Sequence, residues 1–327
     1  MPIHSAAYRP WEGRRVNEST RWLTICSTGI SRAYQSRWLK RLLFSAFLPL
    51  ILVGIPVFLF EQSGRDPVLW QVFARSVGRL PQAAMLGDAI GKLPNNPTPD
   101  EFNAIRRPVW SFLILTFLRY PQAFLMVLVV GIVAPPLISQ DLRTRAYLIY
   151  FARPISRLEY IVGKVGIVSF FLLAISALPA FALYVAAVML SPTFDVVLTT
   201  WDIPIRILVA SACLVIPTTL VALAFSSLTL ESRYAGFAWF AMWIMGHVTY
   251  SSLVAIPRFQ AERAGTTFEP GWRILTSPYQ VLGVAQSYAF GFDSHSEMVV
   301  PCFVLLATVS IVSLAILFRR VTAPMRV

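Results

Sequence analysis

Residues 42–60 read LLFSAFLPLILVGIPVFLF, a run without a charged side chain. The apolar core of a bilayer is ~30 Å thick, and a helix that rises ~1.5 Å per residue needs about 20 apolar residues to cross it. The run therefore predicts a transmembrane helix. Pro49 and Pro56 predict kinks in that helix. Prolines are tolerated within a membrane span because neighbouring helices can satisfy the backbone groups that a proline leaves without a partner.

Five further apolar runs of comparable length follow along the chain. Together with the first, the expected spans are 42–60, 109–138, 161–190, 203–228, 235–256 and 298–318. The composition agrees with membrane insertion, since 56% of the residues are hydrophobic and only 13% are charged. Soluble domains carry about a quarter charged residues. The sequence therefore predicts an all-α membrane protein with six transmembrane helices.

The basic residues predict the orientation of these helices. The chain has 28 Lys and Arg against 16 Asp and Glu. The basic residues crowd beside the apolar runs, which is the pattern of the positive-inside rule and not of a nucleic-acid-binding surface. With both termini inside, the inner segments carry more Lys and Arg than the outer segments. We therefore expect cytoplasmic termini, a lipid bilayer as the surroundings and no nucleic-acid partner.

The N-terminal arm, residues 1–41, ends in a stretch with two different faces. Between residues 21 and 41, apolar side chains such as Trp22 and Trp38 recur at roughly helical spacing among basic ones. This pattern predicts a basic amphipathic helix on the inner leaflet, with its aromatic rings at the depth of the headgroups. The alternative is an ordinary polar arm that precedes the first span.

Residues 42–327 form the expected six-span domain, and two of its outer segments are long. Residues 61–108 are rich in Pro, Gly and Asn, which predicts a long loop with one amphipathic piece near 68–80. Residues 257–297 contain an apolar run that is too broken for a span. That run predicts a short helix that lies on the outer leaflet or dips into it.

Residues 138–164, ISQDLRTRAYLIYFARPISRLEYIVGK, join the second and third spans on the inner side. Their first half has one polar and one apolar face and predicts a short interfacial helix. Arg153-Pro154 ends that helix, because the residue before a proline is pushed out of the helical region. Ser156 and Glu159 have the spacing of a capping box, which predicts a new helix start. This order, a helix followed by a rigid break and a capped helix, is suited to passing a movement of a cytoplasmic partner to the third span.

This segment resembles the cytoplasmic signature of ABC-2-type permeases, the membrane subunits of ATP-binding-cassette transporters. The matching residues are Asp141, Arg153-Pro154-Ile155-Ser156-Arg157, Glu159 and Gly163-Lys164. The resemblance implies an exporter in a bacterial inner membrane, built from this chain, a second permease copy or paralogue, and a separate cytoplasmic ABC ATPase subunit. It further implies a coupling helix between spans 2 and 3, with coupling roles for Asp141, Arg143, Arg153, Pro154, Ser156, Arg157, Glu159 and Lys164.

ATP and Mg²⁺ are expected on that partner subunit, and no cofactor is expected in this chain. The nearest approach to a phosphate-binding loop, residues 87–93, has one residue too few between its glycines and lacks the Ser or Thr that would hold Mg²⁺. His247 lies among methionines that could help it to bind copper, but hydrogen-bonded packing is the commoner role of a lone His in a span. We therefore expect neither a catalytic residue nor a metal site.

Arg119 lies inside the second apolar run, two residues before Pro121. A charge at the centre of a membrane helix costs ~2.5–3.5 kcal/mol on insertion scales. Either residues 109–118 form an outer half-helix from which Arg119 reaches the headgroups, or Arg119 lies within the membrane and contacts an anionic substrate or a lipid headgroup.

Two other classes of function remain to be compared with a permease. A polytopic membrane enzyme or assembly factor would work through the outer loops, but their acidic residues and His295 are scattered along the sequence. An ion-coupled secondary transporter is disfavoured, because the sequence has neither inverted repeats nor paired acidic residues within its spans.

Overall fold

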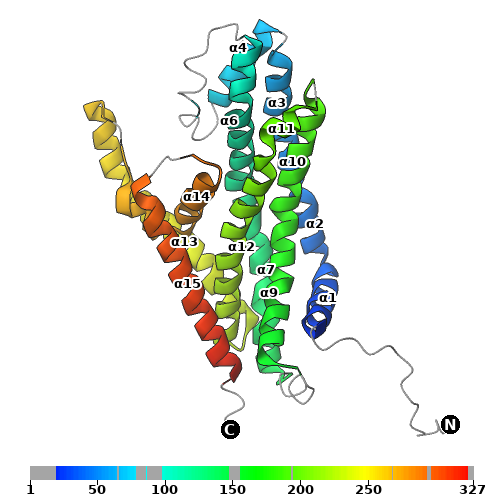
Figure 1. Ribbon diagram of the computed structural model, residues 1–327. Coiled ribbons are helices and arrows are strands. Elements are labelled where there is room, and N and C mark those ends of the chain that lie inside the picture. The colour runs from blue at the N-terminus through cyan, green and yellow to red at the C-terminus, as the bar shows by residue number, and fades with distance from the viewer. Residues whose placement is uncertain are drawn as a thin grey trace, which may run out of the picture.

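The computed structural model describes residues 20–64, 66–78, 86, 98–146, 155–192, 194–266, 268–292 and 296–322. Helices connected by short turns make up these ranges, and no strand occurs within them (Figure 1). The helices are α1 Arg21–Tyr34, α2 Arg37–Ser45, α3 Leu48–Ser63, α4 Pro67–Gly78, α6 Pro99–Phe117, η2 Leu118–Gln122, α7 Ala123–Arg143, α9 Arg157–Ile175, α10 Ala177–Leu190, α11 Val196–Thr200, α12 Asp202–Leu228, α13 Ser232–Ala264, η3 Gly271–Thr276, α14 Pro278–Ala289 and α15 Ser296–Thr322.

Six helical stretches of the described chain are long and apolar enough to cross a membrane, which confirms the expected six. Three of them form the centre of the bundle: the most apolar windows of α6–α7 and α11–α12 are 61% buried, and that of α9–α10 is 50% buried. The windows of α2–α3, α13 and α15 are only 17% buried. The fold is therefore a central group of long helices with three peripheral spans.

The arm and the first span form a chain of three helices along one side of this centre (Figure 1). The helix expected at 21–41 is present as α1 and the first part of α2, with a break where Ser36 caps α2 by accepting a hydrogen bond from Leu39 N at 3.4 Å. A second break falls between α2 and α3. There, Gln122 Nε2 donates to Ala46 O at 2.8 Å, which ties the break to the central bundle.

The second span is longer than expected. A single helical path runs from α6 through α7, and its span covers 44 residues, Asp100–Arg143. The expectation of a loop up to residue 108 is wrong at this point, because a second capping box at Thr98 and Glu101 starts α6 at Pro99. Five residues near the middle, Leu118–Gln122, form a π-helical turn.

A buried polar network holds the outer part of α6 against α3. Arg106 Nε donates to Glu61 Oε1 at 3.1 Å, and Trp110 Nε1 donates to the same oxygen at 3.0 Å. The Glu61 side chain is fully buried and that of Arg106 is 10% exposed. Glu61, expected at the start of an outer loop, therefore lies in the interior, where its charge is balanced by a paired arginine.

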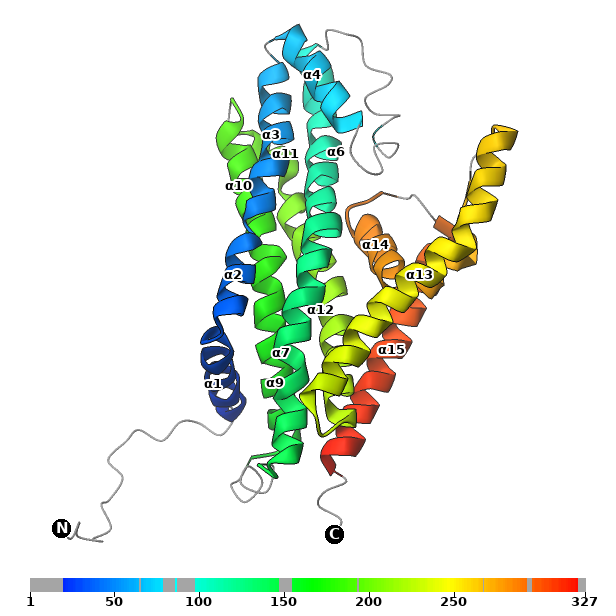
Figure 2. The same ribbon diagram turned by 180° about the vertical axis from the view of Figure 1, so that it is seen from behind.

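The remaining spans depart from the sequence expectation at their ends. The third is divided at Ser176 into α9 and α10, and α13 continues to Ala264, beyond the expected end at residue 256. The short helix expected in the last outer segment is present as α14. Figures 1 and 2 show α13 and α15 leaning away from the upper bundle, with α14 between these two helices and the bundle.

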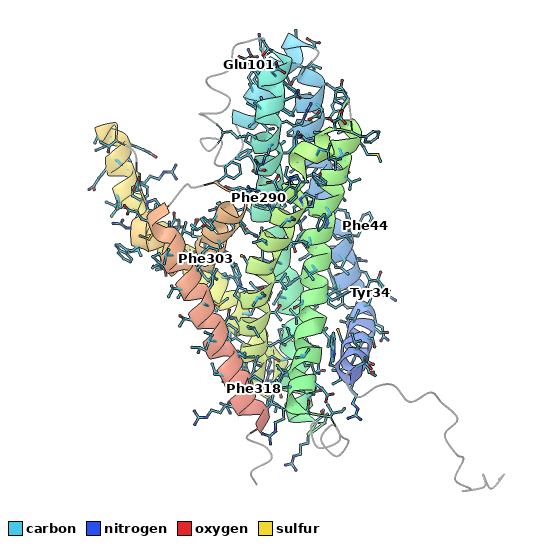
Figure 3. All side chains as sticks on the ribbon, viewed as in Figure 1. Tyr34, Phe44, Glu101, Phe290, Phe303 and Phe318 are labelled. Carbon is cyan, nitrogen blue, oxygen red and sulfur yellow. The ribbon has the colours of Figure 1, made fainter. Side chains whose placement is uncertain are left out.

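Aromatic side chains show the contrast between interior and periphery. Phe44 on α2 is 80% exposed and points away from the bundle, whereas Phe290, just after α14, is 3% exposed (Figure 3). The buried apolar residues fall into two main clusters, one around Phe60 and Trp110 and the other around Phe171 and Trp239. The two clusters give the outer and inner halves of the bundle separate cores.

Candidate functional site

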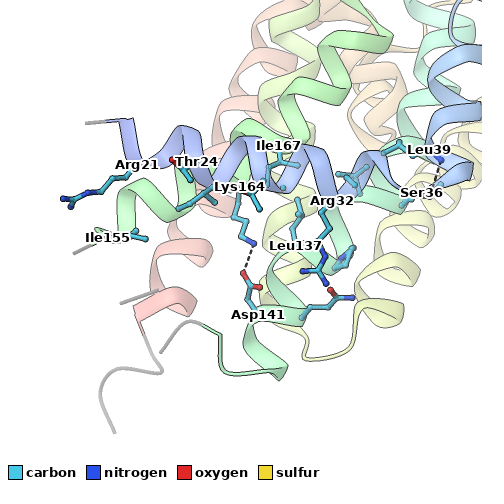
Figure 4. A pocket seen from close by; sticks show the side chains of 18 residues that line it. Arg21, Thr24, Arg32, Ser36, Leu39, Leu137, Asp141, Ile155, Lys164 and Ile167 are labelled. Atoms are coloured by element: carbon cyan, nitrogen blue, oxygen red, sulfur yellow. Dashed lines mark hydrogen bonds and ion pairs between the residues drawn. The ribbon is translucent and has the colours of Figure 1, made fainter. Parts of the chain in front are cut away.

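The segment that joins α7 to α9 is bounded by a polar tie. Lys164 Nζ, on α9, lies 2.7 Å from Asp141 Oδ2, on α7. Tyr160 donates its hydroxyl to the same carboxylate oxygen at 2.8 Å, and its ring lies 5.3 Å from Lys164 Nζ. Lys164 is 7% exposed. Three side chains from two helices thus share one largely buried contact, of which Figure 4 shows the Asp141–Lys164 pair.

Each helix that borders the segment has a defined end. At the end of α7, Ala146 N donates to Asp141 O at 3.0 Å and Arg145 N to Leu142 O at 3.4 Å, with Arg145 at a φ of 53°. This is a Schellman motif, in which glycine usually occupies the left-handed position. At the start of α9 the predicted capping box is present: Ser156 N donates to Glu159 Oε2 at 2.6 Å, and Glu159 N to Ser156 Oγ at 3.2 Å.

The other expected coupling residues lie at the surface or outside the described ranges. Arg157 is exposed at the first position of α9. Arg143 Nη1 lies 3.5 Å from Glu231 Oε1, and their side chains are 58% and 40% exposed. Arg153 and Pro154 lie outside the described residues. The coupling helix expected before them is described only up to residue 146: residues 138–143 form the end of α7, a turn follows, and the rest of that stretch lies outside the described residues. The structure thus brings Asp141 and Lys164 together and places Arg143 on a separate ion pair.

The N-terminal helix α1 packs directly on α9 beside this tie. The contact passes over two glycines of α9: a Cβ at Gly163 would lie 2.8 Å from Ile25 Cβ and 3.2 Å from Trp22 O, and a Cβ at Gly166 would lie 2.9 Å from Cys26 Sγ. Burial in this contact raises the pKa of the Cys26 thiol. The arm is therefore fixed to the helix that begins at the candidate coupling segment.

A cavity of ≈ 790 Å³ lies between α1, α7 and α9 (Figure 4). Its lining is mostly apolar, with Leu137 and Ile167 among its members, and it includes Arg21, Arg32 and the Asp141–Lys164 pair. The volume is in the range of small-molecule sites. Apolar walls with basic residues suit an amphiphilic or apolar group better than a polar solute.

No family model matches this chain, and no curated protein matches it at a significant level.

Arg119 lies elsewhere, within the π-helical turn. It is 6% exposed, and its guanidinium donates to Gln280 Oε1 at 3.0 Å and to Ser287 Oγ at 3.3 Å, both on α14. The outer half-helix with a snorkelling Arg119 is wrong, because α6 and α7 are continuous and the side chain turns inward. Arg119 is not part of the polar tie at residues 141–164, which lies at the other end of α7.

Sequence reasoning missed two members of the site. Tyr160 lies in the segment 138–164 and was given no role, although its spacing four residues before Lys164 places both on one face of a helix. Gly166 gave a weak signal, because a Gly-x-x-Gly spacing with Gly163 predicts a close approach of another helix. The sequence could not show that the approaching helix is the N-terminal arm.

Proposed function

We propose that this chain is the membrane-spanning permease subunit of an ABC-2-type transporter, an exporter driven by a separate cytoplasmic ATPase that docks on residues 138–164. The observation that carries the proposal is the tie between Asp141, Tyr160 and Lys164. It joins the two membrane helices on either side of the segment that resembles the ABC-2-type signature. A force applied to that segment would therefore reach α7 and α9 together.

The arrangement of the spans supports a topology in which both termini lie on the same side of the membrane. Six crossings return the chain to the side from which it started, and α1 lies at the same end of the bundle as the end of α7 and the last turn of α15 (Figure 1). Arg157, Arg319 and Arg320 also lie at this end. By the positive-inside rule this end would face the cytoplasm, and the resemblance to ABC-2-type permeases implies a bacterial inner membrane.

The arm has the features of a helix at the inner leaflet. Tyr34 and Trp38 are 52% and 68% exposed. Lys40 Nζ lies 5.0 Å from the centre of the Tyr34 ring, and Arg41 Cζ lies 5.3 Å from that of Trp38. Exposed aromatic rings beside cations suit the headgroup region. Because α1 also packs on α9, the arm would move with the coupling segment.

In the proposed mechanism the membrane helices of this chain move to let the substrate pass, and the partner subunit hydrolyses ATP. ATP and Mg²⁺ would be bound by the ATPase subunit. Closure of that subunit would push residues 138–164, and the tie would turn the push into a shift of α7 and α9 against the second permease copy. Alternating access would follow from this rearrangement of packed helices.

The test is purification from native membranes in mild detergent, followed by mass spectrometry and an ATPase assay. We expect a stoichiometric co-purifying subunit with a phosphate-binding loop. Arg157→Glu should abolish the coupling of ATP hydrolysis to transport while the spans stay folded. Arg263→Glu is the matched control, because Arg263 is also an exposed arginine and lies on α13, outside the segment. A chain that purifies alone without ATPase activity, or normal substrate-stimulated ATPase in Arg157→Glu, would contradict the proposal.

A further inference from the structure

A small cavity lies beside Arg119, where α7, α12, α13 and α14 meet. Its volume is ≈ 10 Å³, which is room for about one particle the size of a water molecule. The lining residues are Arg119, Ala123, Met126, Leu214, Trp243, Tyr279, Leu282 and Gln286. Most of these side chains are apolar, and none of the described lining residues is acidic.

The guanidinium of Arg119 is held in place by α14. Besides the hydrogen bonds to Gln280 and Ser287, its Cζ lies 5.7 Å from the centre of the Tyr279 ring. A Cβ at Gly283 would lie 2.5 Å from Arg119 Cζ, so the absence of a side chain there makes room for the guanidinium. Burial raises the pKa of the Tyr279 phenol, and the ring therefore brings no negative charge to the cavity at neutral pH.

Two of the lining residues, Trp243 and Gln286, carry further donors. Trp243 is 9% exposed and Gln286 is 2% exposed. Within the described part of the chain, neither Trp243 Nε1 nor Gln286 Nε2 has a hydrogen-bond partner. A buried donor without a partner costs about 1–3 kcal/mol. The neighbouring Trp239 does have a hydrogen-bond partner, because its Nε1 donates to Val127 O at 2.9 Å.

We propose that this cavity binds a single small monovalent anion of the size of a halide. An anion only accepts hydrogen bonds, and the cavity offers it the N–H groups of Trp243 and Gln286 beside the positive charge of Arg119. A water molecule must also donate its own two hydrogens, and the apolar walls give it little to donate to. The cavity is too small for a phosphate group, which excludes a lipid headgroup as the occupant.

The anion would act as a structural ligand. Arg119 belongs to the π-helical turn that leads into α7, Trp243 to α13 and Gln286 to α14, so one ion would join three elements. No bond forms or breaks, and the proposal does not depend on the proposed transport function.

The experiment is a salt comparison on the purified full-length chain in mild detergent. Thermal unfolding is measured in sodium chloride, sodium bromide and sodium gluconate at one ionic strength. We expect saturable stabilisation by both halides, with a rise of about 2–4 °C in the unfolding midpoint over gluconate. Equal midpoints in all three salts would overturn the proposal, and this comparison needs no variant to fold.

Two variants locate the effect. Trp243→Phe and Gln286→Met each remove one donor with little change in shape, and both should lose the halide-dependent rise. Trp239→Phe is the matched control, because it removes a tryptophan N–H that is already bonded to the backbone, and it should keep the rise. A halide response that survives in both cavity variants, or a bromide-soaked crystal without an anomalous peak beside Arg119, would show that the cavity holds no anion.

Discussion

Lys164 Nζ lies 2.7 Å from Asp141 Oδ2, and this ion pair joins the last turn of α7 to the eighth residue of α9. The pair is 23 positions apart in sequence, with residues 142–163 between them. The Tyr160 hydroxyl donates a hydrogen bond to the same Asp141 oxygen. The contact fixes the separation of α7 and α9 at the end of the bundle where we propose that a partner docks.

Replacing Lys164 by Met should destabilise the protein strongly. The change leaves Asp141 without its cation in a site where the side chains are 9% and 17% exposed. Breaking a buried pair on one side typically costs about 3–5 kcal/mol. The free energy of unfolding in mixed micelles measures the loss, and the double variant with Asp141→Asn should recover part of it.

Arg143→Met is the control for this prediction, because the Arg143–Glu231 pair is far more exposed. Exposed pairs contribute about 0–1 kcal/mol. A similar loss of unfolding free energy in Lys164→Met and Arg143→Met would show that the Asp141–Lys164 pair stabilises the protein no more than an exposed pair does.

Arg145→Gly should stabilise the end of α7. Arg145 has a φ of 53° within the Schellman motif, and the left-handed conformation costs a residue with a Cβ roughly 1–2 kcal/mol. Glycine adopts it without that cost, although it also loses more entropy on folding. We expect a net gain of about 0.5–1 kcal/mol in the free energy of unfolding. A loss of stability would mean that the arginine side chain makes contacts that outweigh the backbone strain.

Gly163→Ala should loosen the contact between α1 and α9. The new methyl group would meet Ile25 Cβ and the backbone oxygen of Trp22, and a backbone atom cannot yield without a shift of α1. The rate of maleimide labelling of Cys26, with Cys213 and Cys302 replaced by serine, measures the opening. We expect labelling to become several-fold faster.

Gly54→Ala is the matched control, because a Cβ there would meet no atom within 4 Å. Alanine is about 1 kcal/mol better than glycine inside a helix, so this variant should be neutral or slightly stabilised, with slow labelling of Cys26. Equal labelling rates in the two variants would rule out the close packing of α1 on Gly163.

Glu61→Gln should weaken the outer half of the bundle. The change leaves the buried Arg106 without its counter-charge, at a cost of about 3–5 kcal/mol, although Trp110 could still donate to the amide oxygen. Glu262→Gln is the control, since Glu262 is 62% exposed in its pair with Arg258 and its loss should change the free energy of unfolding by less than about 0.5 kcal/mol. Equal effects would place Glu61 in contact with water.

The features that could be read from the sequence are those that depend on neighbouring residues. Apolar runs predict spans because length and composition decide membrane insertion, and the cap at Ser156 follows from the residue three positions later. The same pattern at Thr98 and Glu101 marks the start of α6, but the prolines and glycines before it favoured a loop that extended to residue 108.

The remaining features depend on residues far apart in the chain. The burial of Arg119 is decided by Gln280 and Ser287 on α14, and a single sequence does not indicate which distant helix comes to lie beside a charge. The same holds for Glu61, whose partner Arg106 is 45 positions away. Charges near the end of an apolar run are ambiguous, because solvation and burial with a partner give the same local pattern.

The π-helical turn at Leu118–Gln122 divides one long helix into two parts with separate rotational settings. Each residue advances an α-helix by about 100°, and a π-turn inserts one residue without breaking the helix. Removal of one residue there would restore regular spacing and rotate the outer part by about that angle, so that Trp110 would swing away from Glu61. The number of residues in this turn therefore sets the rotation of α6 relative to α7, so that the buried faces of both helices point into their respective cores.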